Sequence, residues 1–283
     1  MKNLRAGTKK LLQSGFGKVQ VMAQHKVRPQ YIHRTLRADA HREALVITKK
    51  SQPSPTEETT YLIEWCCHPD SALMNQWTRA GGTGLRIALP HFDARSVCTA
   101  RHATREIKKA LDAGKHARVH ISLPCTCWSS WSRINAHKSE AYKEQRGAQR
   151  RESRLMIQNV LSILKEFEGE RFGASFEWPA NCDGFNEQLC PEMKQLRRYL
   201  PLTTVVDGCA YGLQNPATGV PLRKPWRIIS NCSGIIDKLN ERCPGHVHDR
   251  IQHSLTRGTE RYPMRFVKSL IAGLLTSWFR RRA

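Results

Sequence analysis

The segment ISLPCTCWSSW, residues 121–131, places two cysteines and two tryptophans at the end of a short apolar run. The segment that follows is rich in basic side chains, including Arg133, Lys138, Lys143 and Arg146. Positive charge near a thiol favours the thiolate, which is the nucleophilic form of cysteine. Cys125 is therefore a candidate nucleophile, and the alternative is a small buried apolar residue. Cys127 lies only two residues away, a spacing too short for an easy disulfide.

Glu177 is the second candidate, because it ends the apolar run ASFE and stands before Trp178 and Pro179. A carboxyl group there is either desolvated and protonated near neutral pH or held by hydrogen-bond donors. Both states suit a hydrogen bond to the edge of a nucleic-acid base, whereas the alternative is a surface glutamate paired with an arginine. Trp128, Trp131 and Trp178 offer rings either for stacking an unpaired base or for packing in the core.

A third set of candidates lies near the C-terminus, where the sequence CPGHVH offers Cys243, His246 and His248 within six residues. With Cys209 or Cys232 as a fourth ligand, a tetrahedral zinc site is feasible. The alternative is a polar loop whose histidines contact phosphate or solvent.

The elements that must position these residues follow from hydrophobic periodicity. Short apolar runs predict six strands, at residues 61–66, 85–89, 119–123, 174–177, 203–206 and 226–230. Helical spacing separates the first five of them, at residues 71–80, 97–113, 150–168 and 186–200. This alternation predicts an α/β fold, with helices on both faces of a mostly parallel sheet. The connector at 209–225 is rich in turn formers, so the last two strands should form an antiparallel terminal pair.

Ligands of open α/β sheets gather at the carboxyl ends of the strands. Four segments that follow predicted strands are dense in Cys, Asp, Glu and Trp: CCHPDSAL, LPCTCWSSW, EWPANCDGF and DGCAYGL. We therefore expect Cys125 and Glu177 to meet at one edge of the sheet.

The chain has 283 residues and a formal charge of +22, from 46 Lys and Arg against 24 Asp and Glu. A polyanion, DNA or RNA, is the expected partner, and an acidic protein is the alternative. Residues 1–60 are predicted to be a basic N-terminal extension and linker. Residues 61–283 are predicted to form the α/β domain, with the zinc-binding segment at 232–248.

Ten cysteines without a secretion-type apolar leader predict free thiols and an intracellular protein. A nuclear location is expected, with organelle import as the alternative. No apolar stretch is long enough for a membrane span, and the basic, amphipathic end FVKSLIAGLLTSWFRRRA predicts a packed terminal helix.

The order of these motifs resembles that of cytosine-5 DNA methyltransferases, which have the class I methyltransferase fold. The matching segments are Pro124-Cys125, Glu177-Trp178-Pro179, and Arg223 with Arg227. The resemblance implies that Cys125 adds to C6 of the base, that Glu177 binds the base near N3 and that the arginines line the site. A closer resemblance is to methyltransferase-like open reading frames associated with retroelements of protists. Its blocks are EWCCHPDSAL, SLPCTCWSSWSRIN, FEWPANC, DGCAYGL, GVPLRKPWRI, CPGHVH and TRGTERYP.

The resemblance also implies S-adenosylmethionine as the cofactor, a methyl donor that Glu64, Cys67, Asp70 and Asp93 are the best candidates to hold. Such enzymes usually have a Gly-rich turn after the first strand, where this chain has CCHPD. Three hypotheses follow: a nucleic-acid methyltransferase (a transferase acting on cytosine C5), an inactive DNA-binding or RNA-binding module of the same Rossmann-like fold, and a different enzyme such as a nuclease or deaminase. The Cys-x-x-Cys pair of zinc deaminases is absent.

Overall fold

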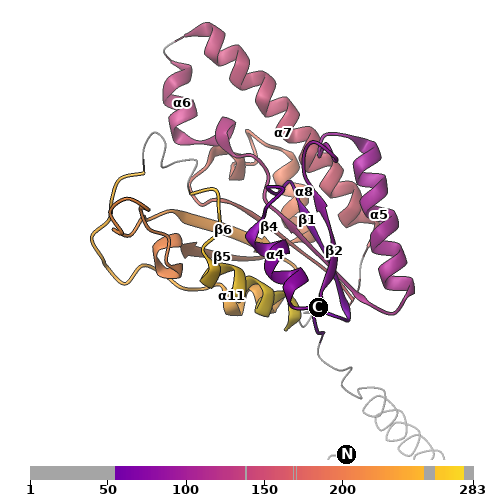
Figure 1. Cartoon of the computed structure of the whole chain (residues 1–283). Coiled ribbons are helices and arrows are strands. Elements are labelled where there is room, and N and C mark those ends of the chain that lie inside the picture. The colour runs from indigo at the N-terminus through magenta and orange to yellow at the C-terminus, as the bar shows by residue number, and fades with distance from the viewer. Residues whose placement is uncertain (1–54, 138, 168, 170, 252–258, 277–283) are drawn as a thin grey trace, which may run out of the picture. The chain divides into compact units, whose positions relative to one another are not determined.

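The computed structural model of the chain describes residues 55–137, 139–167, 169, 171–251 and 259–276 (Figure 1). Of the predicted basic extension, only residues 55–60 are among them. The last part of the predicted terminal helix, residues 277–283, lies outside the described residues, as does Lys138.

Six strands form one sheet, and each corresponds to a predicted apolar run. They are β1 (Thr60–Trp65), β2 (Thr83–Ile87), β3 (His116–Ile121), β4 (Phe172–Pro179), β5 (Leu202–Asp207) and β6 (Pro225–Ser230). Their order in the sheet is β2-β1-β3-β4-β6-β5. The pairs β1–β2, β1–β3 and β3–β4 are parallel, whereas β6 is antiparallel to both β4 and β5. The predicted mostly parallel sheet with an antiparallel terminal pair is therefore confirmed.

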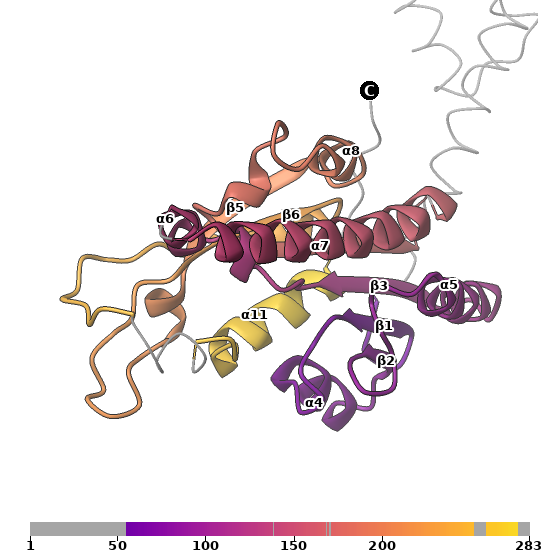
Figure 2. The same ribbon diagram turned by 90° about the horizontal axis from the view of Figure 1, so that it is seen from above.

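Helices cover both faces of this sheet, as predicted. On one face the core includes residues of α5 (Val97–Asp112), α7 (Glu140–Glu166) and α8 (Glu192–Tyr199). On the other it includes residues of α4 (Ala72–Arg79), α9 (Ser233–Lys238) and α11 (Met264–Leu275). Figure 2 shows α7 and α8 on one side, and α4 and α11 on the other. Within the described part of the chain, every helix is too short or too polar to span a lipid bilayer.

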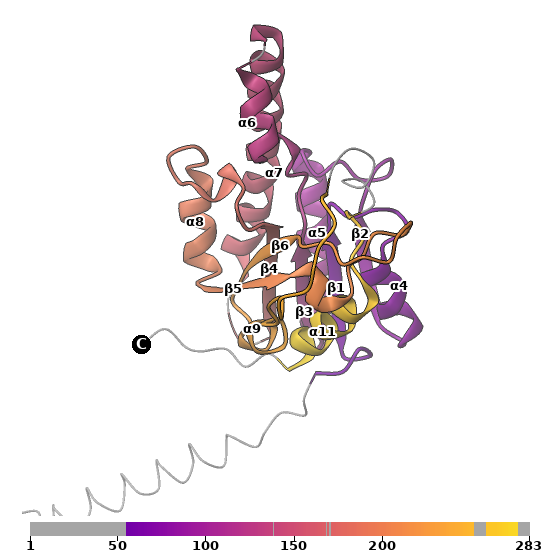
Figure 3. The same cartoon turned by 90° about the vertical axis from the view of Figure 1, so that its left-hand side faces the viewer.

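Helix α7 begins ten residues before the predicted start at residue 150. Its first turns are polar and carry little apolar periodicity, but Ser139 caps the helix by accepting a hydrogen bond from the backbone N–H of Tyr142. Figure 3 shows α6 (Ser130–Ala136) and the adjoining end of α7 extending beyond the sheet. The extra length of α7 therefore forms a projecting pair of helices with α6.

Strand β4 distributes its side chains by the two-residue period of a strand. Phe172, Ala174, Phe176 and Trp178 enter the core beneath α7 and α8. The alternate residues Ser175 and Glu177 face the opposite side of the sheet and are also buried. The same alternation places His120 of β3 on that side. The centre of the sheet thus has one apolar face and one face with a buried polar strip.

Trp128 and Trp178 are core residues, which decides between the two roles considered for them. Both are fully buried. The Trp178 indole donates to the carbonyl of Leu123 at 2.8 Å, and the Trp128 indole donates to the hydroxyl of Ser153 at 2.8 Å. Trp131, in α6, is 69% exposed and is the one ring of the three that can meet a base from solvent.

This difference in burial predicts that two tryptophan substitutions change stability by very different amounts. Trp178→Ala should lower the free energy of unfolding by about 3–5 kcal/mol, because it opens a cavity in the core. The matched change Trp131→Ala should alter it by less than about 0.5 kcal/mol. Urea unfolding followed by circular dichroism measures both, and equal stability of the two variants would contradict the assignment.

Candidate functional site

A cleft of about 670 Å³ runs along the carboxyl ends of β1, β3 and β4. This volume is in the range of small-molecule sites. The cleft is lined by both groups of acidic and thiol residues that the sequence singled out: Glu64, Cys67, Asp70, Asp93, Cys125 and Glu177. The parallel order of these strands explains the meeting, because their ends lie at the same edge.

Cys125 occupies the turn between β3 and the short helical turn η1 (Thr126–Trp128), and it is half-buried. Burial raises the pKa of the Cys125 thiol to about 11, with a smaller contribution in the same direction from Glu177 and an opposing one from Lys224. The resting side chain is therefore a thiol. The prediction that nearby positive charge favours the Cys125 thiolate is wrong, because burial raises the pKa more than that charge lowers it.

Two of the basic residues expected to activate Cys125, Arg133 and Arg146, make a different contact, which they share with Arg150. Arg146 and Arg150 each donate to the carbonyl of Cys127, at 3.2 and 3.1 Å, and to the carboxylate of Asp183, both at 2.9 Å. Arg133 also pairs with Asp183, at 3.2 Å. These cations fix the turn after Cys125 to α7 and are partly neutralised by Asp183.

Glu177 is buried at the floor of the cleft and is held by two hydroxyl donors. Tyr262 donates to its carboxylate at 2.7 Å, and Ser122 donates at 3.1 Å. The hydroxyl of Tyr262 also lies 3.3 Å from Nε2 of His120, whose Nδ1 lies 2.9 Å from the hydroxyl of Ser175. Burial raises the pKa of Glu177, although both donors and Lys224 oppose the rise. Glu177 is thus both desolvated and held by hydrogen-bond donors, which the sequence analysis treated as alternatives.

Tyr262 and Lys224 are two of the site residues that the sequence patterns did not single out. Lys224 lines the cleft, and its ammonium donates to the carbonyl and hydroxyl oxygens of Thr259 at 2.9 and 3.2 Å. Both residues lie within the resemblance blocks GVPLRKPWRI and TRGTERYP, which was the available signal. Arg261, from the second block, also lines the cleft.

Arg223 and Arg227 are not among the residues that line the cleft. The guanidinium of Arg223 lies 3.7 Å from the carboxylate of Asp207. The guanidinium of Arg227 lies 4.8 Å from the ring centroid of Phe185. Arg227 alternates along β6 with Trp226 and Ile228, which enter the core beneath α11, so its side chain faces the other side of the sheet.

The other end of the cleft contains the cofactor candidates. Glu64 is 4% exposed and accepts a hydrogen bond from the hydroxyl of Ser71, the residue that caps α4. Burial raises its pKa to about 7. The thiol of Cys67 donates to the carbonyl of Glu64 at 3.5 Å. Asp70 is exposed and accepts from the amide of Asn75 at 2.6 Å.

Asp93 follows β2 and forms a two-pronged ion pair with Arg95. Nε of Arg95 lies 3.0 Å from one carboxylate oxygen, and its terminal nitrogen lies 2.8 Å from the other. These hydrogen bonds lower the pKa of Asp93, which therefore presents a carboxylate to the cleft.

The turn after β1 has no glycine, but it has a conformation that glycine favours. Cys66 has φ of 62°, and it is the one non-glycine residue with positive φ in the described part of the chain. Its backbone N–H and that of Cys67 donate to the carbonyl of Ile87, at 2.8 and 3.3 Å. Left-handed backbone costs energy at a residue with a side chain and concentrates at functional sites.

No protein-family model, curated protein or solved structure matches the chain. Besides the cleft, the structure brings together a second cluster of side chains.

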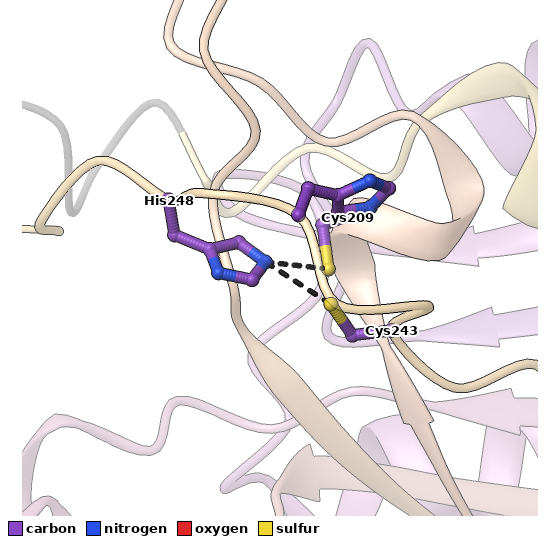
Figure 4. Close-up of side chains that lie close together, drawn as sticks. Cys209, Cys243 and His248 are labelled. Carbon is purple, nitrogen blue, oxygen red and sulfur yellow. Dashed lines mark hydrogen bonds between the residues drawn. The ribbon is translucent and has the colours of Figure 1, made fainter.

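That second cluster, the Cys/His cluster, consists of Cys209, Cys243, His246 and His248. One ligand atom from each lies within 4.8 Å of all the others. Figure 4 shows the thiols of Cys209 and Cys243 facing the ring of His248, and Nε2 of that ring is 3.3 Å from each sulfur. Cys232, the other fourth ligand considered, is buried before α9 beside Gly173 and is not in the cluster.

The raised pKa of Glu64 predicts a pH dependence of stability. A glutamate normally loses its proton near pH 4.5, whereas folded Glu64 keeps it up to about pH 7, so the free energy of unfolding falls as the pH rises between these values. Glu64→Gln should therefore stabilise the chain more at about pH 8 than at about pH 5, by on the order of 2 kcal/mol. Urea unfolding of wild type and variant at both pH values measures the difference.

The control is Glu144→Gln, which changes an exposed carboxyl on α7. It should alter stability equally at the two pH values. An equal effect of Glu64→Gln at both pH values would show that Glu64 titrates as an exposed side chain does.

Proposed function

We propose that the chain is an S-adenosylmethionine-dependent methyltransferase that acts on a nucleic-acid base, cytosine at C5. The observation that carries this proposal is the shared cleft of Cys125 and Glu177 at the ends of two adjacent strands. A thiol can add to C6 of a pyrimidine, and a buried acid can hydrogen-bond to N3 of the same ring. Both groups are needed together, because addition at C6 makes C5 nucleophilic only when N3 receives a proton or a hydrogen bond.

The resting protonation state of Glu177 suits this chemistry, whereas the Cys125 thiol must lose its proton to react. Because its pKa is raised, Glu177 can retain a proton and donate it to N3, with Tyr262 and Ser122 holding the carboxyl in place. Sγ of Cys125 bonds to C6 as the thiol proton leaves to solvent, and Glu177 becomes the carboxylate. Lys224 favours both anions, since its charge lowers the pKa of Cys125 and of Glu177.

S-adenosylmethionine would supply the methyl group that C5 gains. Product release needs three proton movements: C5 loses its hydrogen as a proton, Glu177 recovers the proton from N3 as the bond between Cys125 and C6 breaks, and the departing Cys125 thiolate takes a proton back from solvent. The net change is replacement of the C5 hydrogen by methyl, with one proton released, and the side chains of the chain return to their starting states.

The end of the cleft that contains Asp70 and Asp93 has side chains that suit this cofactor. Asp93 offers a carboxylate that suits ribose hydroxyls, and Asp70 offers another that suits an ammonium group. Cys66 gives the turn after β1 its left-handed backbone, as a glycine would in the usual cofactor loop. Arg95 already pairs with the carboxylate of Asp93, so a bound cofactor would have to share that carboxylate with Arg95.

Charge supports a nucleic-acid substrate, DNA or RNA. The formal charge is +22, and Lys224 and Arg261 border the end of the cleft that contains Glu177. The exposed ring of Trp131 lies on the projecting α6 and can stack on an unpaired base. A base must leave the duplex to reach a buried carboxyl group, so single-stranded or flipped cytosine is the expected form.

A second function, nucleic-acid binding without methyl transfer, is favoured by one observation. Cys66 keeps its side chain at the turn where a cofactor would approach most closely, and that side chain lines the cleft. A chain of this kind would bind DNA or RNA with strong salt dependence and would not bind S-adenosylmethionine.

Covalent trapping separates the two functions. With S-adenosylmethionine and an oligonucleotide containing 5-fluorocytosine, the wild type should form an adduct that survives denaturation. The reason is that C5 then carries fluorine in place of the hydrogen that must be removed as a proton before Cys125 can leave. Cys125→Ser should form none, whereas Cys127→Ala should retain it. Glu177→Gln should slow adduct formation by about 10²–10⁴-fold through loss of the acid.

The controls are cofactor binding by calorimetry and oligonucleotide binding at two salt concentrations. An adduct that survives in Cys125→Ser would refute the assigned nucleophile. Absence of both adduct and cofactor binding, with salt-sensitive oligonucleotide binding intact, would replace the methyltransferase by the binding module.

A further inference from the structure

The four side chains of the Cys/His cluster have the types and spacing of a metal site. In tetrahedral zinc, bonds of about 2.3 Å to sulfur and 2.1 Å to nitrogen separate a sulfur and a nitrogen ligand by about 3.6 Å. The two such distances to Nε2 of His248 are both 3.3 Å. Small side-chain movements would therefore complete the coordination.

The backbone around Cys243 is already shaped for a sulfur ligand. Gly245 has φ of 103°, which turns the chain tightly between Cys243 and His246. Its N–H points at Sγ of Cys243 at 3.3 Å. A backbone donor of this kind stabilises a thiolate, the form of cysteine that binds metal.

Two carboxylates anchor the backbone on either side of the cluster. Asp207, which ends β5, accepts from the N–H of Cys243 at 3.0 Å and from Nε of Arg242 at 2.9 Å. Asp249, next to His248, accepts from the amide of Asn215 at 2.8 Å and from the hydroxyl of Thr218 at 2.7 Å. The ligands are therefore held near one another by contacts that need no metal.

We propose that Cys209, Cys243, His246 and His248 bind one structural Zn²⁺ ion. Four protein ligands leave no open position for water or substrate, which distinguishes a structural site from a catalytic one. Two thiolates and two imidazoles suit zinc, whereas calcium and magnesium require oxygen ligands that the cluster does not offer.

The site joins two segments that lead to the cleft. Cys209 lies in η3 (Gly208–Tyr211), at the start of the connector that delivers Lys224 to the cleft. His248 precedes, in the chain, the residues Thr259 to Tyr262, which also line the cleft. Lys224 binds Thr259 directly. Zinc therefore fastens the connector to the segment that carries Tyr262, and its role is to stabilise the wall of the site.

Elemental analysis tests the proposal on the full chain purified without chelators. We expect one zinc per chain in the wild type. Cys243→Ser and His248→Asn should lower the zinc content about tenfold or more under matched dialysis. The controls Cys98→Ser and His137→Asn change an exposed cysteine and an exposed histidine outside the cluster, and they should retain full zinc.

Two further measurements keep the test independent of whether a ligand variant folds. Cobalt substituted into the wild type should give the intense visible bands of a tetrahedral site, together with thiolate charge-transfer bands. Removal of zinc from the wild type should increase amide hydrogen exchange in residues 240–250 and 208–224, and added zinc should reverse the increase.

Three results would overturn the proposal: a folded wild type that contains no metal and takes up neither zinc nor cobalt, full zinc retained by Cys243→Ser, or a disulfide between Cys209 and Cys243 in freshly purified protein. None of these readouts depends on methyl transfer, so the zinc site and the proposed activity can fail separately.

Discussion

A buried carboxyl group must find hydrogen-bond donors, and the donors of Glu177 come from segments far apart in the chain. The two-residue period of β4 sends Phe176 and Trp178 into one core, which obliges Glu177 to face the other side of the sheet. Ser122 reaches it from the end of β3, and Tyr262 reaches it from the segment before α11. Burial of this acid therefore depends on the parallel pairing of the strands and on the return of the C-terminal segment to the sheet.

The same constraint gives the cleft its chemistry. Because β3 and β4 end side by side, the thiol that follows one and the acid that ends the other open into a common space, with Lys224 as a cation in the lining. Lys224 is held by Thr259, so the cation and the Tyr262 donor belong to one connected wall. Cys209 and His248 of the Cys/His cluster lie in the two segments that lead along the chain to that wall.

Much of the fold could be predicted because its signals are local. Each strand contains a short apolar run, and the turn-rich connector before β6 predicted the antiparallel pair correctly. Strands β2 and β3 begin before their predicted apolar runs, at Thr83 and His116. In β2, a Cβ on Gly84 would clash with the carbonyl of Leu62, a close approach that hydrophobicity cannot reveal. Cys125 and Glu177 were found through their positions at strand ends. Tyr262, Lys224 and the choice of Cys209 over Cys232 depend on tertiary contacts, which spacing along the chain does not encode.

In the proposed function, one extruded base meets both Cys125 and Glu177. A structure of the chain with S-adenosylmethionine and a 5-fluorocytosine oligonucleotide measures this directly. We predict a flipped base in the cleft, with C6 bonded to Sγ of Cys125 and N3 within hydrogen-bonding distance of the Glu177 carboxyl. Nucleic acid bound on another surface with no base in the cleft, or a base bonded through a different cysteine, would contradict it.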